Sequence, residues 1–160
     1  MELKSHQEKI IKQLVTQEEM LSKLYGYFSE QFPEYGNFWD KLSSEEQRHA
    51  RLIQKLFDAA KREKIFFDEG KMTTYTLSSF ISRMEDILNK AENGEYTMAT
   101  ALICAVDYEN SLIEKNIFTH FDSLNDKVKG TLKILQSETI NHVDLIRKAQ
   151  KSYTATGMGL

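Results

Sequence analysis

Four long segments of this chain repeat apolar residues at every third or fourth position, and this pattern constrains the fold more than any other feature. Residues with this spacing lie on one face of an α-helix, so each segment is predicted to be an amphipathic helix. Only one proline, Pro33, occurs in the 160 residues. Because so few residues break the pattern, the chain is typical of long helices and not of short strands joined by turns.

The limits of the pattern predict where each helix begins and ends. Long helices are expected at residues 3–31, 35–64, 95–121 and 126–153, with a shorter one at residues 74–92. A helix of this length extends about 40 Å and cannot bury its apolar face alone. Tight turns within each half and a long connection between the halves predict an all-α, ferritin-like antiparallel four-helix bundle, with a crossover that carries the extra short helix. The bundle is expected over 1–153, with a flexible tail at 154–160.

Charge and cysteine content exclude several other classes of protein. The net charge is −3 and both signs are interspersed, so no basic patch predicts binding to nucleic acid or to an anionic membrane. No apolar run is long enough to span a membrane. Cys104 is the only cysteine, which argues against a disulfide framework and against a cysteine-based zinc or iron site. We therefore expect a cytoplasmic protein.

Carboxylate and imidazole side chains interrupt each long apolar face near the middle of its helix. These residues are Glu18, Glu46, His49, Glu109, Glu138 and His142. The midpoints of equal antiparallel helices lie at one level, so the six side chains are expected to converge. In the second and fourth helices, Glu and His are three or four residues apart, which puts each pair on one helix face.

This combination of side chains favours a dinuclear metal site. A lone Glu or His on an apolar face is more often a boundary residue or a hydrogen-bonded core residue than a ligand. Four carboxylates at one buried level, however, would repel one another strongly unless they were protonated or bound to cations. Two divalent ions would neutralise four glutamates. Carboxylate and imidazole ligands suit iron or manganese, and zinc is also possible.

The same residues resemble the rubrerythrin and ferritin-like superfamily of di-iron carboxylate proteins over nearly the whole chain. The first helix resembles the family pattern in which Tyr25 follows Glu18 by seven residues. The second matches the Glu-x-x-His motif with Glu46-Gln-Arg-His49, and the third resembles the family segment that ends on a bridging Glu, here Glu109. The resemblance implies the bundle fold and two bound iron ions.

The fourth helix departs from the family pattern. The family has Glu-x-x-His here, whereas this chain has Thr139 three residues before His142 and Glu138 four residues before it. Bacterioferritin binds haem through a Met at the position of Gln47, so no haem is expected. The resemblance implies that Glu18 caps one metal, that His49 and His142 each bind one, and that carboxylates bridge or cap the pair; these are Glu46, Glu109 and Glu138.

Three functions are considered for this chain, two from the resemblance and one that involves no metal. A rubrerythrin-like protein would reduce hydrogen peroxide or react with dioxygen in oxidative-stress defence, with an external electron donor and as a homodimer. A bacterioferritin-like ferroxidase would oxidise and store iron. A helical interaction protein would bind no metal. Tyr25 is the candidate catalytic residue, either bonding a peroxide or passing an electron, and a plain core tyrosine is the alternative.

Overall fold

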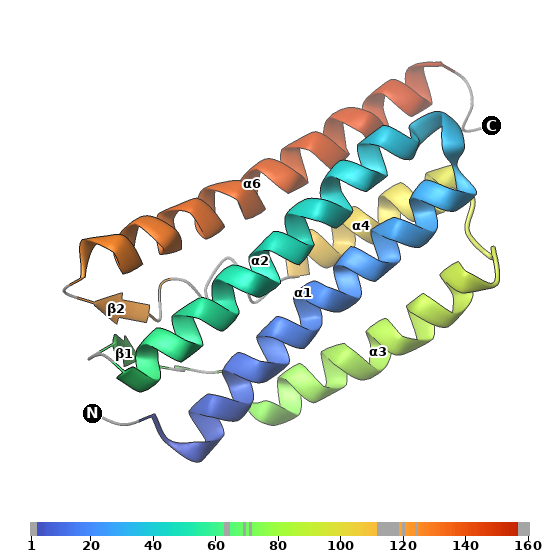
Figure 1. Ribbon diagram of the computed structural model, residues 1–160. Coiled ribbons are helices and arrows are strands. Elements are labelled where there is room, and N and C mark those ends of the chain that lie inside the picture. Colours follow the sequence, from blue (N-terminus) through green and yellow to red (C-terminus); the bar gives the residue numbers. More distant parts are fainter. Residues whose placement is uncertain are drawn as a thin grey trace.

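The computed structural model describes residues 3–62, 65–68, 70, 72–111, 119, 121–123 and 125–156. Over these residues the fold is a helical bundle with one minor pair of strands, as Figure 1 shows. The helices in chain order are α1 (Ser5–Gln31), the 3-10 helix η1 (Pro33–Tyr35), α2 (Gly36–Arg62), α3 (Thr74–Glu92), α4 (Met98–Ser111) and α6 (Asp126–Ala155). The strands are β1 (Ile65–Phe67) and β2 (Phe121–Ser123).

Helices α1 and α2 form an antiparallel hairpin that is the most extensively packed pair of the described bundle. Small residues let their backbones approach closely. Ser22 Oγ donates to the Ser43 carbonyl at 2.8 Å, and Ser43 Oγ donates to the Ser22 carbonyl at 2.7 Å. The turn between the helices is η1, which begins at Pro33, because the fixed φ of proline suits the first residue of a helix.

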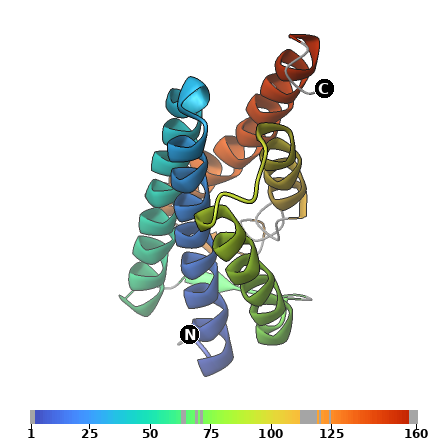
Figure 2. The same cartoon turned by 90° about the vertical axis from the view of Figure 1, so that its right-hand side faces the viewer.

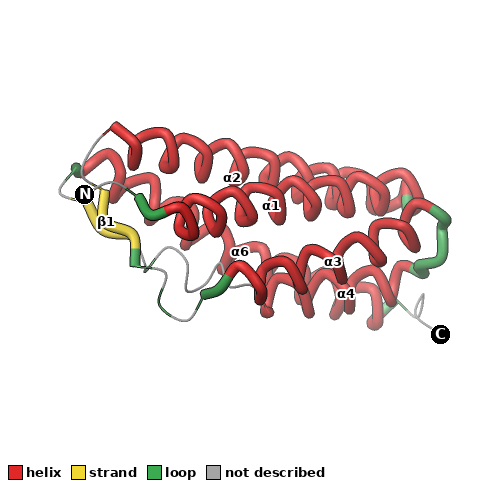
Figure 3. The backbone as a smooth tube through the Cα atoms, turned by 90° about the horizontal axis from the view of Figure 1, so that it is seen from below, coloured by secondary structure: helices red, strands yellow, loops and turns green. Residues whose placement is uncertain are grey.

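The second half of the chain packs α4 against α6, while α3 lies along α1. Figure 2 shows α3 beside α1. The connection that follows α3 leads away from α1 to α4, which lies beside α6. Since α3 carries the chain back along the bundle, α2 and α4 run in the same direction (Figures 1 and 3). Gly94, at φ 70°, forms the turn before α4, in a conformation that glycine adopts without strain.

The predicted third helix is wrong at its C-terminal end. It was expected over 95–121, but α4 begins at Met98 and its described part ends at Ser111, while residues 112–118 lie outside the described residues. Phe121 lies in β2, which pairs antiparallel with β1 and places Phe67 opposite Phe121. Phenylalanine and isoleucine favour strands. At Phe121, hydrogen bonding to a strand from the other half of the chain decides the structure, although the sequence pattern there is helical.

The other helices agree closely with the sequence pattern. The short helix predicted at 74–92 is confirmed as α3, and Thr73 caps its N-terminus by accepting a hydrogen bond from the Thr76 amide. Helix α6 begins at Asp126 as expected and continues through Ala155, two residues beyond the predicted boundary. Asn125 caps it by accepting from the amides of residues 127 and 128.

In the described part of the chain, buried apolar side chains form two clusters, one toward each end of the bundle. The cluster at the end with β1 and β2 includes Ile11, Ile53 and Leu135. The other, nearer the η1 turn, includes Tyr25, Trp39 and Leu102. Most of the buried polar and charged side chains, which include Glu18, Glu46 and Glu109, lie at the level between them. None of the described helices has an apolar stretch of sufficient length to cross a lipid bilayer.

Candidate metal centre

Five of the six predicted metal ligands are buried at the middle of the bundle. Glu18, Glu46, His49, Glu109 and His142 each expose 1% or less of their surface. They come from α1, α2, α4 and α6, because each occupies the core-facing position of its helix between apolar residues. Burying this many ionisable groups is costly unless they compensate one another or bind ions.

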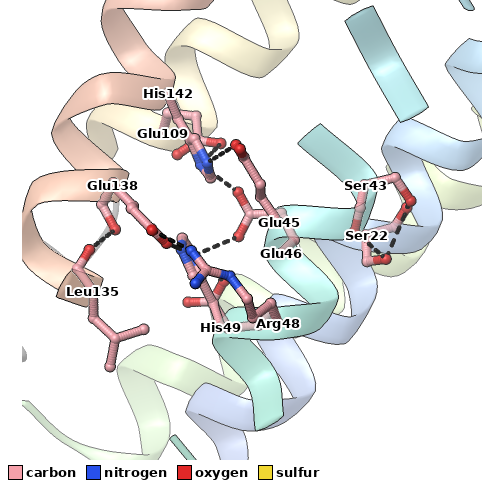
Figure 4. Close-up of polar contacts among 12 residues, drawn as sticks. Ser22, Ser43, Glu45, Glu46, Arg48, His49, Glu109, Leu135, Glu138 and His142 are labelled. Carbon is pink, nitrogen blue, oxygen red and sulfur yellow. Dashed lines mark hydrogen bonds and ion pairs between the residues drawn. The ribbon is translucent and has the colours of Figure 1, made fainter. Parts of the chain in front are cut away.

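Glu46 lies at the centre of this group. Its Oε1 is 2.7 Å from Nδ1 of His142 and its Oε2 is 3.3 Å from Nδ1 of His49. The two imidazole rings stack, with centroids 5.1 Å apart and planes 20° from parallel. One oxygen of Glu46 therefore contacts the imidazole of α6, and the other contacts the imidazole of α2, as Figure 4 shows.

A second carboxylate approaches the inner nitrogen of each imidazole. Glu18 Oε2 is 3.8 Å from Nδ1 of His49, and Glu109 Oε1 is 3.7 Å from Nδ1 of His142. Each Nδ1 atom thus lies near Glu46 and near one further carboxylate of its own. The arrangement has an approximate twofold symmetry that relates the α1–α2 hairpin to the α4–α6 pair.

The outer nitrogens of the two imidazoles contact carboxylates at the edge of the site. His49 Nε2 is 3.0 Å from Glu138 Oε2, and His142 Nε2 is 2.8 Å from Glu45 Oε2 (Figure 4). Glu138 also pairs with Arg48, and its side chain is 28% exposed. The structure therefore brings Glu138 to the outer nitrogen of His49 and not to the inner side of the site, where both Nδ1 atoms lie. It places Glu138 where it orients an imidazole ring through the outer nitrogen.

Glu45 is a site residue that the sequence reasoning missed. The signal is present in the sequence when the two helices are aligned on their histidines. Glu45 stands four residues before His49, as Glu138 stands four before His142, and Glu46 corresponds to Thr139. The sequence prediction treated Glu138 as the counterpart of Glu46, although the two stand at different distances from their histidines. A difference of one residue is a rotation of about 100° around the helix, so Glu138 and Glu46 point in different directions.

Tyr25 lies directly against the inner carboxylates. Its hydroxyl donates a hydrogen bond to Glu109 Oε1 at 2.7 Å, and its ring, which is fully buried, lies 5.6 Å from that of Trp39. Burial raises the pKa of Tyr25 well above its usual value, and the nearby charges of Glu109 and Glu46 raise it further. The phenol therefore stays protonated and keeps donating to Glu109 at neutral pH.

Without a cation, protons balance the charge at the centre. Burial alone would raise the pKa of Glu46, but the contacts with His142 and His49 outweigh it and lower the pKa to about 2. Burial and the charge of Glu46 raise the pKa of Glu109 to about 7. Burial would lower the pKa of His142, yet Glu109 and Glu46 raise it to about 11. The inner carboxylates thus favour positive charge at their centre.

The donor atoms fit a metal ion. Both oxygens of Glu46, Oε2 of Glu18, Oε2 of Glu109 and Nδ1 of His142 are buried without an aligned hydrogen-bond partner among the described residues. One possible ligand atom each from Glu46, His49 and His142 lies within 4.8 Å of the other two, which is close enough for metal binding. Buried polar atoms without a hydrogen-bond partner call for an explanation, and a bound ion is one. Carboxylate oxygens and imidazole nitrogens are ligand atoms that iron, manganese and zinc take in proteins.

Comparison with known proteins supports this interpretation. The family model described as Rubrerythrin matches residues 9–130. The matched range contains Glu18, Glu46, His49 and Glu109 and ends before His142. Searches of the curated proteins and of the solved structures found no match.

Proposed function

The chain belongs to the rubrerythrin family, and from this premise we propose that it binds two iron ions and uses them to reduce hydrogen peroxide. The observation that carries the proposal is the position of Glu46, whose two oxygens face the inner nitrogens of two different imidazoles. A carboxylate so placed would help to hold both ions, with His49 holding one of them and His142 the other. Family membership makes iron the preferred metal over manganese or zinc.

Each ion would have its own set of ligands around the shared Glu46. Glu18 and His49 would hold one ion, and Glu109 and His142 the other. When bound, a pair of ferrous ions supplies two electrons, which with two protons reduces one hydrogen peroxide to two water molecules. Two further electrons must then come from an external donor before the next turnover.

The surrounding residues would position the ligands and keep the site dry. Glu45 and Glu138 contact the outer nitrogens, so they fix the ring orientations that direct both Nδ1 atoms inward. The apolar clusters on either side, which include Leu14, Leu21 and Leu135, exclude bulk water from this level of the bundle. Tyr25 holds Glu109 in place and offers a hydroxyl beside it.

The rate of oxidation by each oxidant tests this proposal. Purified protein is loaded with ferrous iron without oxygen, and its oxidation is followed separately after mixing with hydrogen peroxide and with dioxygen. We expect peroxide to be the faster oxidant, with one peroxide consumed per two irons. Faster oxidation by dioxygen, with uptake of many irons per chain, would contradict the proposal and indicate a ferroxidase that stores iron.

Replacing Tyr25 with phenylalanine is expected to slow oxidation by peroxide while two irons still bind. The substitution removes the hydroxyl that donates to Glu109 at 2.7 Å but keeps the ring that packs on Trp39. Stopped-flow measurement should give a rate about 100-fold or more below wild type, which is the lower end of the range for a positioned proton donor. Tyr75→Phe, at a side chain that is 80% exposed, is the matched control and should leave the rate unchanged. Equal rates for all three proteins would assign Tyr25 to the core alone.

A further inference from the structure

A cavity with aromatic walls lies at the end of the bundle that carries the η1 turn. The turn, the start of α4 and the end of α6 lie at this end (Figure 1). The cavity has a volume of about 430 Å³, which is within the usual range for small-molecule sites. Its described walls include the partly buried rings of Phe32, Tyr35 and Tyr153 and the thioether of Met98. Such walls favour a flat aromatic ligand, because aromatic rings stack on one another.

A chain of aromatic rings connects this cavity with the metal centre. Phe32, in the cavity wall, lies 6.1 Å from Phe28, measured between ring centroids. Phe28 lies 5.0 Å from Trp39, and Trp39 lies 5.6 Å from Tyr25. The hydroxyl of Tyr25 then donates a hydrogen bond to Glu109 at 2.7 Å. The three inner rings are fully buried, so packed side chains and not solvent fill the connection.

This connection suits the transfer of electrons to the metal centre. The proposed function needs two electrons from an external donor in every turnover. The five inner side chains expose 1% or less of their surface, so a donor in solvent cannot touch the ions that they would hold. Electron transfer becomes much slower as the distance between donor and acceptor grows, and it is faster through packed atoms than across a gap. A donor held in the cavity would therefore have a better route than one elsewhere on the surface.

The chemistry of the acceptor and the charge of the cavity narrow the class of donor. Each ferric ion accepts one electron at a time. A nicotinamide gives up its electrons as a hydride, whereas a reduced flavin can release them singly, and the reacting part of a flavin is a flat system of three rings. Within the described lining, Glu34 is the one charged side chain. A negative charge does not favour a phosphate, so recognition is expected to depend on the rings.

We propose that this cavity binds the ring system of a free reduced flavin and that the aromatic chain conducts its electrons to the metal centre. The electron acceptor in this inference rests on the proposed function. A reduced flavin releases two electrons and two protons as it becomes oxidised. The two electrons return two ferric ions to the ferrous state, and the two protons replace those that reduction of one peroxide consumes. Each turnover thus converts one reduced flavin and one hydrogen peroxide into one oxidised flavin and two water molecules.

Binding of riboflavin to the metal-free protein tests the cavity independently of the metal. Oxidised riboflavin has the same ring system and is fluorescent, and stacking on aromatic side chains quenches this fluorescence. We expect one riboflavin to bind per chain, with an affinity at least equal to that of flavin mononucleotide, which adds a phosphate. Absence of quenching would overturn the inference and leave the proposed function standing. Much tighter binding of the mononucleotide would also overturn it, because a phosphate site would then decide recognition.

Variants of Tyr153 locate the bound ring. Tyr153→Ala removes one aromatic wall and should weaken riboflavin binding at least about fivefold, the lower end of the range for stacking on one aromatic side chain. Tyr153→Phe keeps the ring and should bind as wild type does. Tyr75→Ala removes an exposed tyrosine of α3 outside the cavity and should also leave the affinity unchanged. Equal affinities in all four proteins would overturn the assignment to this cavity.

Anaerobic stopped-flow mixing of reduced riboflavin with the diferric protein tests the electron transfer. We expect one flavin to be oxidised per two irons, at a rate that reaches a plateau as the flavin concentration rises. Tyr153→Ala should raise the half-saturating concentration at least about fivefold, and Tyr75→Ala should not change it. A rate without a plateau that is the same in all three proteins would overturn the electron route. If wild type does not hold two irons, the proposed function and the electron route fail together, and riboflavin binding alone decides the cavity.

Discussion

Replacing Glu46 with alanine is expected to abolish stoichiometric binding of both metal ions. Among the described carboxylates, Glu46 alone has two oxygens that face both inner nitrogens, at 2.7 and 3.3 Å. Its loss removes a ligand from each ion and leaves two of the three inner carboxylates to balance their charge. Because even an outer partner of a ligand is worth about 10- to 100-fold in metal affinity, loss of this shared ligand should lower affinity at least about 100-fold. Metal analysis after anaerobic loading and desalting measures this.

Two further variants separate metal binding from folding in this experiment. Glu46→Gln keeps the shape of the side chain and removes its charge, so it should fold like wild type and still bind less than one ion per chain. Glu19→Ala removes a carboxylate at an exposed neighbour of Glu18 on α1, and should keep two ions. Two ions per chain in a folded Glu46→Ala protein would mean that Glu46 is not the shared ligand.

Replacing Trp39 with alanine is expected to cause the largest loss of stability. Its side chain is fully buried, and its ring lies 5.6 Å from Tyr25, 5.0 Å from Phe28 and 4.9 Å from Phe38, measured between centroids. Removing a buried aromatic side chain costs about 3–5 kcal/mol. For a chain of this size each kcal/mol lowers Tm by about 2–4 °C, so Tm should fall by about 6–20 °C. Thermal unfolding of the metal-free protein followed by circular dichroism measures the change.

The control for this prediction is Tyr75→Ala. Tyr75 is also a large aromatic residue on a helix, but it is 80% exposed, so its loss should change the free energy of unfolding by less than about 0.5 kcal/mol. Trp39→Phe keeps an aromatic ring and should fall between the two. A Trp39→Ala protein that is destabilised by less than about 1 kcal/mol would mean that the cluster near the η1 turn repacks around the gap.

The long helices could be predicted from the sequence because their stability depends on a periodic apolar face. In α1, α2 and α6 this face is continuous over many turns, and the boundaries followed to within two residues wherever the structure describes them. The end of α4 could not be predicted in this way. Phe121 belongs to a strand whose partner, Phe67, lies more than fifty residues away, and periodicity within one segment carries no information about such a contact.

The inner site residues were also predictable, since a buried carboxylate on an apolar face stands out in the sequence. On α6 it was harder to predict which side chain faces the inner site. Glu138 and Thr139 are adjacent, and the choice between them depends on the rotation of α6 relative to α2, which His142 determines through its contact with Glu46. Aligning the two halves on their histidines gives that rotation. The contact of Glu45 with His142 follows from the same alignment.

Anomalous X-ray scattering from crystals loaded anaerobically with ferrous iron tests the central claim most directly, because it locates each iron atom. The account predicts two iron positions at the middle of the bundle on either side of Glu46, one beside Nδ1 of His49 and one beside Nδ1 of His142, about 3.5–4 Å apart as in other two-metal sites. A single iron position would contradict this account, and so would the absence of iron among the five inner side chains, which are Glu18, Glu46, His49, Glu109 and His142.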